Sequence, residues 1–173
     1  MAFTDVASSA YYYDAVKWAV EQGITSGITA TTFGPDASCT RAQMVSFLWR
    51  ANGSPKAAGA NPFTDVSADA YYYDAVLWAV EKGITSGTSA TTFSPNATVT
   101  RGQTVSFLHR ANGSPAVSGS SPFTDVAADA YYAAAVQWAV AENITAGTSA
   151  TTFSPDAACT RGQIVSFLYR DMA

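Results

Sequence analysis

The chain has 173 residues, of which 48% are hydrophobic and 13% aromatic, so it is too apolar for a disordered segment and can form a packed core. Its net charge of −4 and isoelectric point near 4.7 exclude the basic field that nucleic-acid binding requires. No apolar run reaches the ~18 residues of a membrane-spanning helix, and the opening "MAFTDV" is not a signal peptide, so neither membrane insertion nor a leader is expected within this chain.

A threefold repeat with a period of 60 residues organises the sequence. The motif "FTDV" begins at Phe3, Phe63 and Phe123, and 29 of the 48 positions counted from that Phe are identical in all three copies. We expect repeats at 1–53, 62–113 and 122–173, joined by small, polar linkers at 54–61 and 114–121. Units this small share a core with their neighbours. Linkers of constant length favour one closed, pseudo-three-fold module with a central helical bundle.

The first element of each repeat is an amphipathic helix, expected over residues 11–22 in the first copy. Apolar side chains at Val16, Ala19 and Val20 follow helical spacing. The expected N-caps are Ser9, Asp69 and Asp129. The expected stops are Gly23, Gly83 and Asn143, because Gly and Asn tolerate the left-handed conformation after a helix.

A long loop and a second helix complete each repeat. The segment "GITSGITATTFGPDASC" predicts a structured loop, with a short strand at 31–33, and loops of this length are usually functional. The second helix is expected over 40–51, opened by a Thr-x-x-Gln capping box and ended by Asn52-Gly53 before Pro55. The fold class is therefore mainly α, with three two-helix repeats.

The two cysteines, Cys39 and Cys159, occupy one repeat position where the second copy has Val99. A position that accepts Cys or Val indicates a small buried apolar site, with a disulfide as the alternative. Two cysteines and the single His109 match no metal-ligand set, so neither a metal nor a cofactor is expected.

Arginine recurs at the first position of each second helix. These residues are Arg41, Arg101 and Arg161. A cation is unfavourable there, but a guanidinium beside free first-turn N–H groups would hold a carboxylate or phosphate. The alternative is an internal partner among Asp5, Asp65 and Asp125. Gln43, Gln103 and Gln163 would cap the helix without repelling an anion. If the arginines serve the ligand, Arg41→Ala with Arg101→Ala should weaken binding without unfolding the protein.

Other repeated side chains have simpler interpretations. Arginines at the second helix's C-terminal end, where a cation is favourable, need no ligand. They are Arg50, Arg110 and Arg170. The repeated Trp and Phe positions indicate core, whereas the tyrosines that open the first helix could lie at a wet surface. Trp49, His109 and Tyr169 share a position that suits a groove edge or a repeat–repeat contact. Because no nucleophile motif occurs and the only acid retained in every copy is one Asp, we expect no enzymatic activity.

The motifs "FTDV", "YYYDAV", "GITSG", "TTFGP" and "TRAQ" follow one another at spacings that resemble the S-layer homology (SLH) repeat. The resemblance covers nearly the whole chain. It implies a non-catalytic module at the bacterial cell surface that binds secondary cell-wall polysaccharide in grooves between repeats. The ligand implied is a pyruvylated amino sugar. A cargo domain, absent from these residues, would be the anchored protein. A protein–protein interaction module is the alternative.

The resemblance also implies site residues. Ligand contacts would come from the arginines at 41, 101 and 161 and from two further sets. These are Gly27, Gly87, Gly147, and Tyr11, Tyr71, Tyr131. The aspartates at 5, 65 and 125 and the glutamines at 43, 103 and 163 would orient or support them. The third repeat departs from the pattern at Ala133, Ala134 and Asn143, so its groove could differ.

Overall fold

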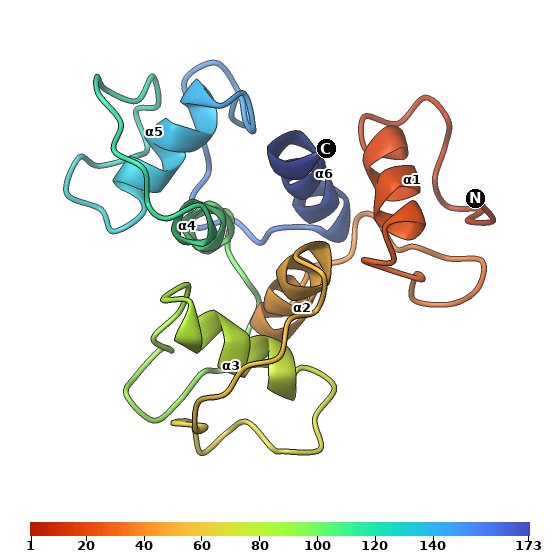
Figure 1. Cartoon of the computed structure of the whole chain (residues 1–173). Coiled ribbons are helices and arrows are strands. Elements are labelled where there is room, and N and C mark those ends of the chain that lie inside the picture. Colours follow the sequence, from red (N-terminus) through yellow and green to blue (C-terminus); the bar gives the residue numbers. More distant parts are fainter.

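The computed structural model describes all 173 residues, which form six helices and no strand (Figure 1). The helices are α1 (Tyr13–Glu21), α2 (Arg41–Ala51), α3 (Tyr73–Glu81), α4 (Arg101–Ala111), α5 (Ala133–Ala141) and α6 (Arg161–Met172). The mainly α class is confirmed. None of the helices has the length and apolar character that crossing a membrane requires.

The second helix of each repeat, which we call the inner helix because α2, α4 and α6 contact one another, begins where its capping box predicted. The first helices, α1, α3 and α5, are called the outer helices. The Thr40 side chain accepts the Gln43 N–H, and the Gln43 side chain accepts the Thr40 N–H, at 3.1 and 3.0 Å. The same reciprocal pair opens α4 and α6. Each box satisfies two N–H groups at the helix start, and a cap of this kind stabilises a helix by about 1 kcal/mol.

The outer helices α1, α3 and α5 end as expected but begin differently. Gly23 and Asn143 follow their helices at φ of 70° and 59°, in the left-handed region. The N-caps predicted at residues 9, 69 and 129 are wrong, because α1 starts only at Tyr13 and has no side-chain cap. A backbone turn replaces it, with the Tyr13 N–H donating to the Ala10 carbonyl oxygen at 3.0 Å.

The strand expected at 31–33 is also absent. The Phe33 N–H donates to the Asp5 carboxylate instead of to a neighbouring strand. The ladder contacts are three isolated bridges, which join Ser38 to Thr160, Thr40 to Thr98, and Thr100 to Ala158. Pairing therefore occurs just before the inner helices and always between repeats.

The helices form three lobes around a centre, as Figure 1 shows. The inner helices contact one another, while α3 packs on α2, α5 on α4 and α1 on α6. Each outer helix therefore packs on the inner helix of a neighbouring repeat, and the contact of α1 with α6 closes the arrangement. One cluster of 35 buried hydrophobic residues spans all three repeats.

A ring of backbone hydrogen bonds joins the repeats at the centre. Cys39 N–H donates to Cys159, Cys159 to Val99, and Val99 to Cys39, at 3.2, 2.9 and 2.9 Å. Both cysteines are free and at most 1% exposed, which confirms the buried apolar position. Burial raises the pKa of Cys39 to about 12 and of Cys159 to about 11, so both thiols stay protonated at neutral pH.

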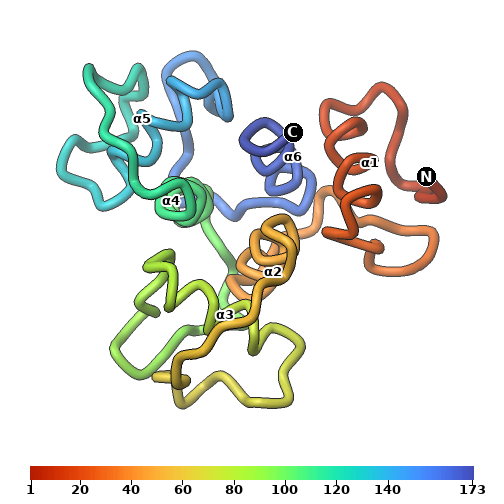
Figure 2. The backbone as a smooth tube through the Cα atoms, viewed as in Figure 1, coloured from red at the N-terminus to blue at the C-terminus, as the bar shows by residue number.

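The linkers do not loop freely into solvent. After α2 and α4 the chain crosses into the next lobe, where it passes along α3 and α5 (Figure 2). The Trp49 indole N–H donates to the Pro55 carbonyl oxygen at 2.8 Å, and His109 Nε2 lies 2.9 Å from the Pro115 carbonyl oxygen, where it must be the donor. His109 also pairs with Trp138, and Tyr169 with Trp18, so the variable ring position makes repeat–repeat contacts.

Candidate functional site

Three equivalent grooves lie between the repeats, with volumes of about 290, 370 and 290 Å³. We name them after the arginine at the start of an inner helix: the Arg41, Arg101 and Arg161 grooves. The Arg41 groove takes that arginine from the first repeat, the loop 85–88 and one face of α4 from the second, and Tyr131 from the third. Every groove thus needs all three repeats.

The structure brings most of the predicted ligand residues together in these grooves. Each groove contains one predicted arginine, one glycine, one glutamine and one tyrosine. The sets are Arg41, Gly87, Gln103, Tyr131; Arg101, Gly147, Gln163, Tyr11; and Arg161, Gly27, Gln43, Tyr71. The three aspartates do not line the grooves. Residues far apart in sequence therefore meet only when the repeats assemble.

Each groove arginine is a buried structural anchor. Arg41 is 5% exposed, and its Nε donates to the Phe93 carbonyl oxygen at 2.9 Å. Its guanidinium carbon lies 4.8 Å from the ring centre of Phe93 and 5.5 Å from that of Phe107, within cation–π range. Burial lowers the pKa of the Arg41 guanidinium, which nonetheless stays charged in proteins. This arginine therefore binds two repeats together as well as lining a groove.

The helix-start N–H groups are not free, which corrects the expectation that they help to hold an anion. The Arg41 N–H donates to the Ala97 carbonyl oxygen at 2.8 Å and the Ala42 N–H to that of Pro95 at 3.0 Å. The third N–H serves the capping box. At the starts of α4 and α6, the first two N–H groups likewise donate to carbonyl oxygens in the loop of another repeat. An anion in the groove therefore has side-chain donors to meet rather than the helix N-terminus.

The repeated aspartates act through a peptide group rather than through a direct arginine pair. Asp5 accepts the N–H groups of Phe33 and Gly34 at 2.9 and 2.7 Å. The carbonyl oxygen of the same Phe33–Gly34 peptide accepts Nε of Arg161 at 2.7 Å. The carboxylate and the guanidinium thus polarise one peptide from its two ends. The partner of Asp5 is Arg161 from the third repeat, and Asp65 and Asp125 serve Arg41 and Arg101 alike.

The pKa of Asp5 follows from these contacts. Desolvation raises it, but the amide hydrogen bonds from Phe33 and Gly34 outweigh that effect, with a smaller contribution from the charge of Arg161. The pKa of Asp5 is therefore lowered, and Asp125 behaves in the same way. Both stay ionised at neutral pH, opposite a buried arginine.

The sequence did not identify a second arginine in each groove. Arg110 lines the Arg41 groove, Arg170 the Arg101 groove and Arg50 the Arg161 groove. Nη1 of Arg110 donates to the Ile84 carbonyl oxygen at 3.0 Å, so α4 holds the loop that forms the groove wall. The recurrence of arginine at this position in all three repeats was a signal for a site. A favourable location near a helix C-terminus explained that recurrence without a ligand. Each groove thus holds two guanidinium groups and no carboxylate in its lining.

The tyrosines form the exposed side of the grooves. Tyr11, Tyr71 and Tyr131 are 64%, 61% and 63% exposed, and each meets the next tyrosine edge-on at about 5 Å. Partial burial raises the pKa of Tyr11 and Tyr71, so their hydroxyls are neutral. Exposed rings on rigid partners suit the apolar face of a sugar ring.

Glycine is needed at the loop position for conformational reasons. Gly27 has φ of 90°, and a Cβ there would lie 2.5 Å from the Phe3 ring. Its N–H already donates to the Thr25 hydroxyl at 3.1 Å. The glycine therefore lets the loop come close to Phe3. Because its N–H is already used, it would shape the groove rather than donate to a ligand.

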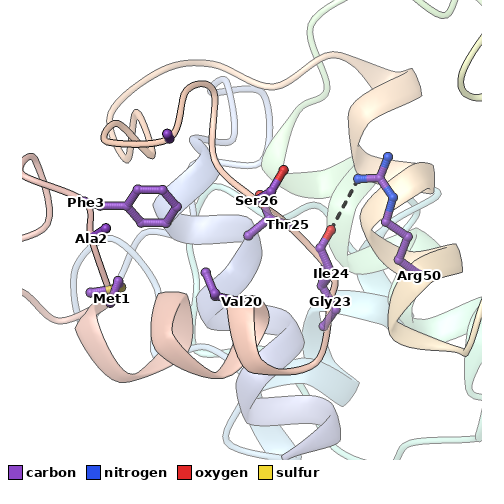
Figure 3. A pocket seen from close by; sticks show the side chains of 10 residues that line it. Met1, Ala2, Phe3, Val20, Gly23, Ile24, Thr25, Ser26 and Arg50 are labelled. Atoms are coloured by element: carbon purple, nitrogen blue, oxygen red, sulfur yellow. Dashed lines mark hydrogen bonds between the residues drawn. The ribbon is translucent and has the colours of Figure 1, made fainter.

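A larger hollow of about 500 Å³ lies beside the first repeat (Figure 3). Phe3, Val20 and Ile24 line it, and Arg50, which donates to the Ile24 carbonyl oxygen at 3.3 Å, stands at its edge. It adjoins the Arg161 groove through Thr25, Ser26 and Arg50. No group of three or more His, Cys, Asp or Glu side chains in the chain could hold a metal ion.

Comparison with known proteins identifies the family of the repeat. The family model of the S-layer homology domain matches residues 2–45, 62–105 and 122–165. The chain is 34% identical over 157 residues to a Surface-layer 125 kDa protein of Lysinibacillus sphaericus, covering 88% of this chain and 13% of that protein. It is 32% identical over 116 residues to a Cell surface protein of Thermoanaerobacter kivui, covering 64% and 15%.

An Endoglucanase of Bacillus sp. (strain KSM-635) is 34% identical over 109 residues, covering 63% of this chain and 11% of that enzyme. The chain thus spans only a small part of the length of these relatives. Their names differ in kind, although each is similar to this chain over 109 to 157 residues. The chain belongs to the S-layer homology domain family, whose repeat it carries three times.

Proposed function

We propose that this chain is a non-catalytic module that anchors a surface protein to a bacterial cell wall by binding secondary cell-wall polysaccharide in its three grooves. Domains of this family are in general cell-wall anchoring modules, and two of the relatives are named as surface proteins. Repeats at 1–53, 62–113 and 122–173, related by approximate three-fold symmetry, would present three copies of one site.

One observation carries the choice of ligand: each groove lining combines two arginines, hydroxyl groups and a tyrosine, and contains no acid. Such a lining favours an anionic group on a sugar, and the carboxylate of a pyruvate ketal fits a guanidinium fork. Because Nε of Arg41 is occupied by Phe93, the terminal nitrogens of Arg41 and Arg110 would meet the carboxylate. The amide nitrogen of Gln103, whose oxygen serves the capping box, would add a neutral donor.

The linings lack the pair of carboxyl side chains with which most glycoside hydrolases cleave a sugar. They contain no Asp, Glu, His or Cys side chain to act as acid, base or nucleophile. A charge-assisted hydrogen bond contributes about 1.5–3 kcal/mol, so one groove alone binds weakly. Three grooves facing a repeating polymer would gain strength by avidity.

The departures in the third repeat do not reach its groove. Ala133 and Ala134 line a separate hollow under the second linker, and Asn143 lies beyond the end of α5. The Arg101 groove, which the third repeat's loop builds, keeps the same arginines, glutamine and glycine, and differs in having Ala146 where the other two grooves have Ser26 and Ser86. We therefore propose that all three grooves bind.

Titration of purified wall polysaccharide by calorimetry, before and after removal of pyruvate, tests this proposal. We expect each site to bind the depyruvylated polymer more than about tenfold more weakly, because each site loses a charge-assisted contact of ~1.5–3 kcal/mol. Equal affinity for both polymers would reject the carboxylate role.

Protein–protein interaction was the other candidate. The ring position shared by Trp49, His109 and Tyr169 gives this alternative less support, because these rings contact linkers and neighbouring repeats. Pull-down on deproteinised cell-wall sacculi separates the two. Oligomers that form with rising concentration, without binding to sacculi, would favour protein–protein interaction.

A further inference from the structure

A hollow of about 540 Å³ lies between the second linker and α5, along which that linker runs (Figure 2). Ala133 and Gln137 line it from α5, and Val126 lines it from the segment that precedes the helix. The hollow shares no residue with the three grooves, and its lining contains no Asp, Glu, Lys or Arg side chain. Its volume lies within the range of about 300–1,000 Å³ that is common for small-molecule pockets. The hollow therefore suits a small, uncharged ligand.

The lobe of α3 shows which side chains the hollow lacks. The helices α3 and α5 begin at equivalent residues and are each nine residues long. Tyr73 of α3 is half-buried and packs against the hydrophobic core, whereas its copy on α5 is Ala133. Other lining positions also carry the smaller side chain in the third repeat: Ala134 for Asp74, Ser121 for Asn61, Ala116 for Lys56 and His109 for Trp49. The largest apolar group missing from the hollow is thus the phenol ring of a tyrosine.

The valine of the "FTDV" motif is uncovered where that ring is missing. Val6 and Val66 are 7% and 4% exposed, in the two repeats that have the tyrosine. Val126, in the repeat that has Ala133, is only half-buried and lines the hollow. An apolar surface that the other two repeats bury is therefore open in the third.

A hydrogen-bond donor is missing at the same place. In the second repeat, Asn61 Nδ2 donates to the Val66 carbonyl oxygen at 2.8 Å. Ser121 replaces this asparagine, and its shorter side chain accepts the Phe123 N–H at 3.1 Å without reaching the Val126 carbonyl oxygen. The hollow thus combines an uncovered apolar side chain with a carbonyl oxygen that has lost its donor.

We propose that this hollow binds a phenol, a single aromatic ring with one hydroxyl group, carried by a free small molecule or by a tyrosine side chain of a peptide. The ring would occupy the place that Tyr73 fills in the second repeat and would cover Val126. The hydroxyl would donate to the Val126 carbonyl oxygen. A phenol has a pKa near 10 and is neutral at pH 7, which matches a lining without charged side chains. This binding does not depend on polysaccharide, because the grooves use other residues.

The experiment titrates the ¹⁵N-labelled chain at pH 7 with p-cresol, which is the tyrosine side chain alone. We expect saturable shifts of the backbone signals of Ala133, Gln137 and the linker 114–121, with a dissociation constant on the order of 1 mM, because one ring offers little contact area. Toluene, which keeps the ring but lacks the hydroxyl, should bind at least about threefold more weakly.

A blocked Gly-Tyr-Gly peptide distinguishes the two sources of the phenol. An affinity similar to that of p-cresol would show that the tyrosine of a peptide enters the hollow. An affinity at least about tenfold lower would restrict the site to free phenols.

A variant that restores the tyrosine makes the site assignment specific. Ala133→Tyr should abolish the saturable p-cresol shifts and raise the melting temperature, because the chain then fills its own hollow. Ala141→Glu also restores the residue of the second repeat on α5, at an exposed position outside the lining, and should leave the affinity for p-cresol unchanged. Circular dichroism checks that both variants fold. If Ala133→Tyr does not fold, Ala133→Leu fills part of the same space and should weaken p-cresol binding about fivefold or more.

Three outcomes would overturn the proposal. The first is the absence of saturable shifts up to about 20 mM p-cresol, a range that would detect binding tenfold weaker than expected. The second is unchanged p-cresol affinity in a folded Ala133→Tyr variant, which would place the binding elsewhere. The third is toluene binding as tightly as p-cresol, which would leave the hydroxyl without a role.

Discussion

Each groove has a buried floor and an exposed rim, and the two are built from different kinds of residue. In the Arg41 groove the floor is the buried Arg41 and the half-buried Gly87, whose Nε and backbone N–H donate to groups within the protein. The rim is the half-buried Arg110, which donates through Nη1 to the Ile84 carbonyl oxygen, and Tyr131, which is 63% exposed. The same repeated pattern thus serves folding on the floor and leaves ligand contact mainly to the rim. Substitutions should separate the two.

Arg41→Ala should have the largest effect, and on stability. The substitution removes a charge-assisted hydrogen bond and two cation–π contacts, and it leaves the buried Phe93 carbonyl oxygen without its partner. We expect a loss of about 3 kcal/mol or more in the free energy of unfolding, measured by urea denaturation. The expectation from sequence that this change spares the fold is therefore revised.

A second variant separates the effect of the charge from that of the Nε hydrogen bond. Arg41→Lys retains the charge but cannot reproduce the Nε bond while facing the groove, so it should lose roughly half as much stability as the alanine variant. An alanine variant as stable as the unmodified chain would show that the arginine is held for the ligand alone.

Gly87→Ala should come next, with Gly83→Ala as its matched control. Both glycines have positive φ, of 87° and 69°, so alanine is strained at each by about 1 kcal/mol. At Gly83 a Cβ would meet nothing within 4 Å, whereas at Gly87 it would lie 2.5 Å from the Phe63 ring and still closer to the Thr92 carbonyl oxygen. We expect Gly87→Ala to cost at least about 2 kcal/mol in thermal unfolding. Equal costs would mean that the loop is not pressed against the Phe63 ring.

The sequence predicted the inner helices almost to the residue, because their signals are local. Thr40 and Gln43 are three positions apart, and the reciprocal hydrogen bonds need nothing else. The outer helix starts were mispredicted because the acceptor for Tyr13 is the backbone carbonyl of Ala10, and any residue supplies one.

The groove residues were predicted one by one, but the sequence did not show which of them share a groove. The repeated Arg, Gly, Gln and Tyr positions were found by comparing copies, but their grouping depends on packing between repeats. The Ala97 and Pro95 carbonyls that occupy the start of α2 belong to another repeat and leave no side-chain signature. The role of Arg110 was hidden likewise, since its partner is the Ile84 backbone.

Arg110→Gln should affect the ligand more than the fold. The residue is half-buried and makes one backbone contact through Nη1, so we expect a stability loss within about 1 kcal/mol. Affinity for wall polysaccharide at that groove should fall about tenfold. Lys82→Gln, an equal charge change on an exposed lysine outside the groove lining, is the control for long-range electrostatics. If both variants weaken binding equally, general charge rather than the rim explains the affinity.

The smallest effect should appear on acidification, and it tests how the floor is held. The folded-state pKa values of Asp5 and Asp125 are lowered from 3.8, chiefly through amide hydrogen bonds that outweigh desolvation. Their contribution to stability is therefore fully present above about pH 4 and is lost as the pH falls through the folded-state values. Asp5→Asn should lower the melting temperature at pH 6 and flatten its decline between pH 4 and pH 2.

Asp129→Asn provides the matched comparison, because this carboxylate is exposed and accepts no loop amide. It should shift the melting temperature little at pH 6 and leave the acid decline steep. If Asp5→Asn and Asp129→Asn gave parallel pH curves, the peptide between Asp5 and Arg161 would not carry the coupling described above. The floor arginine would then be held by its packing against the phenylalanines alone, and ligand affinity should stay constant down to the pH at which the ligand carboxylate itself is protonated.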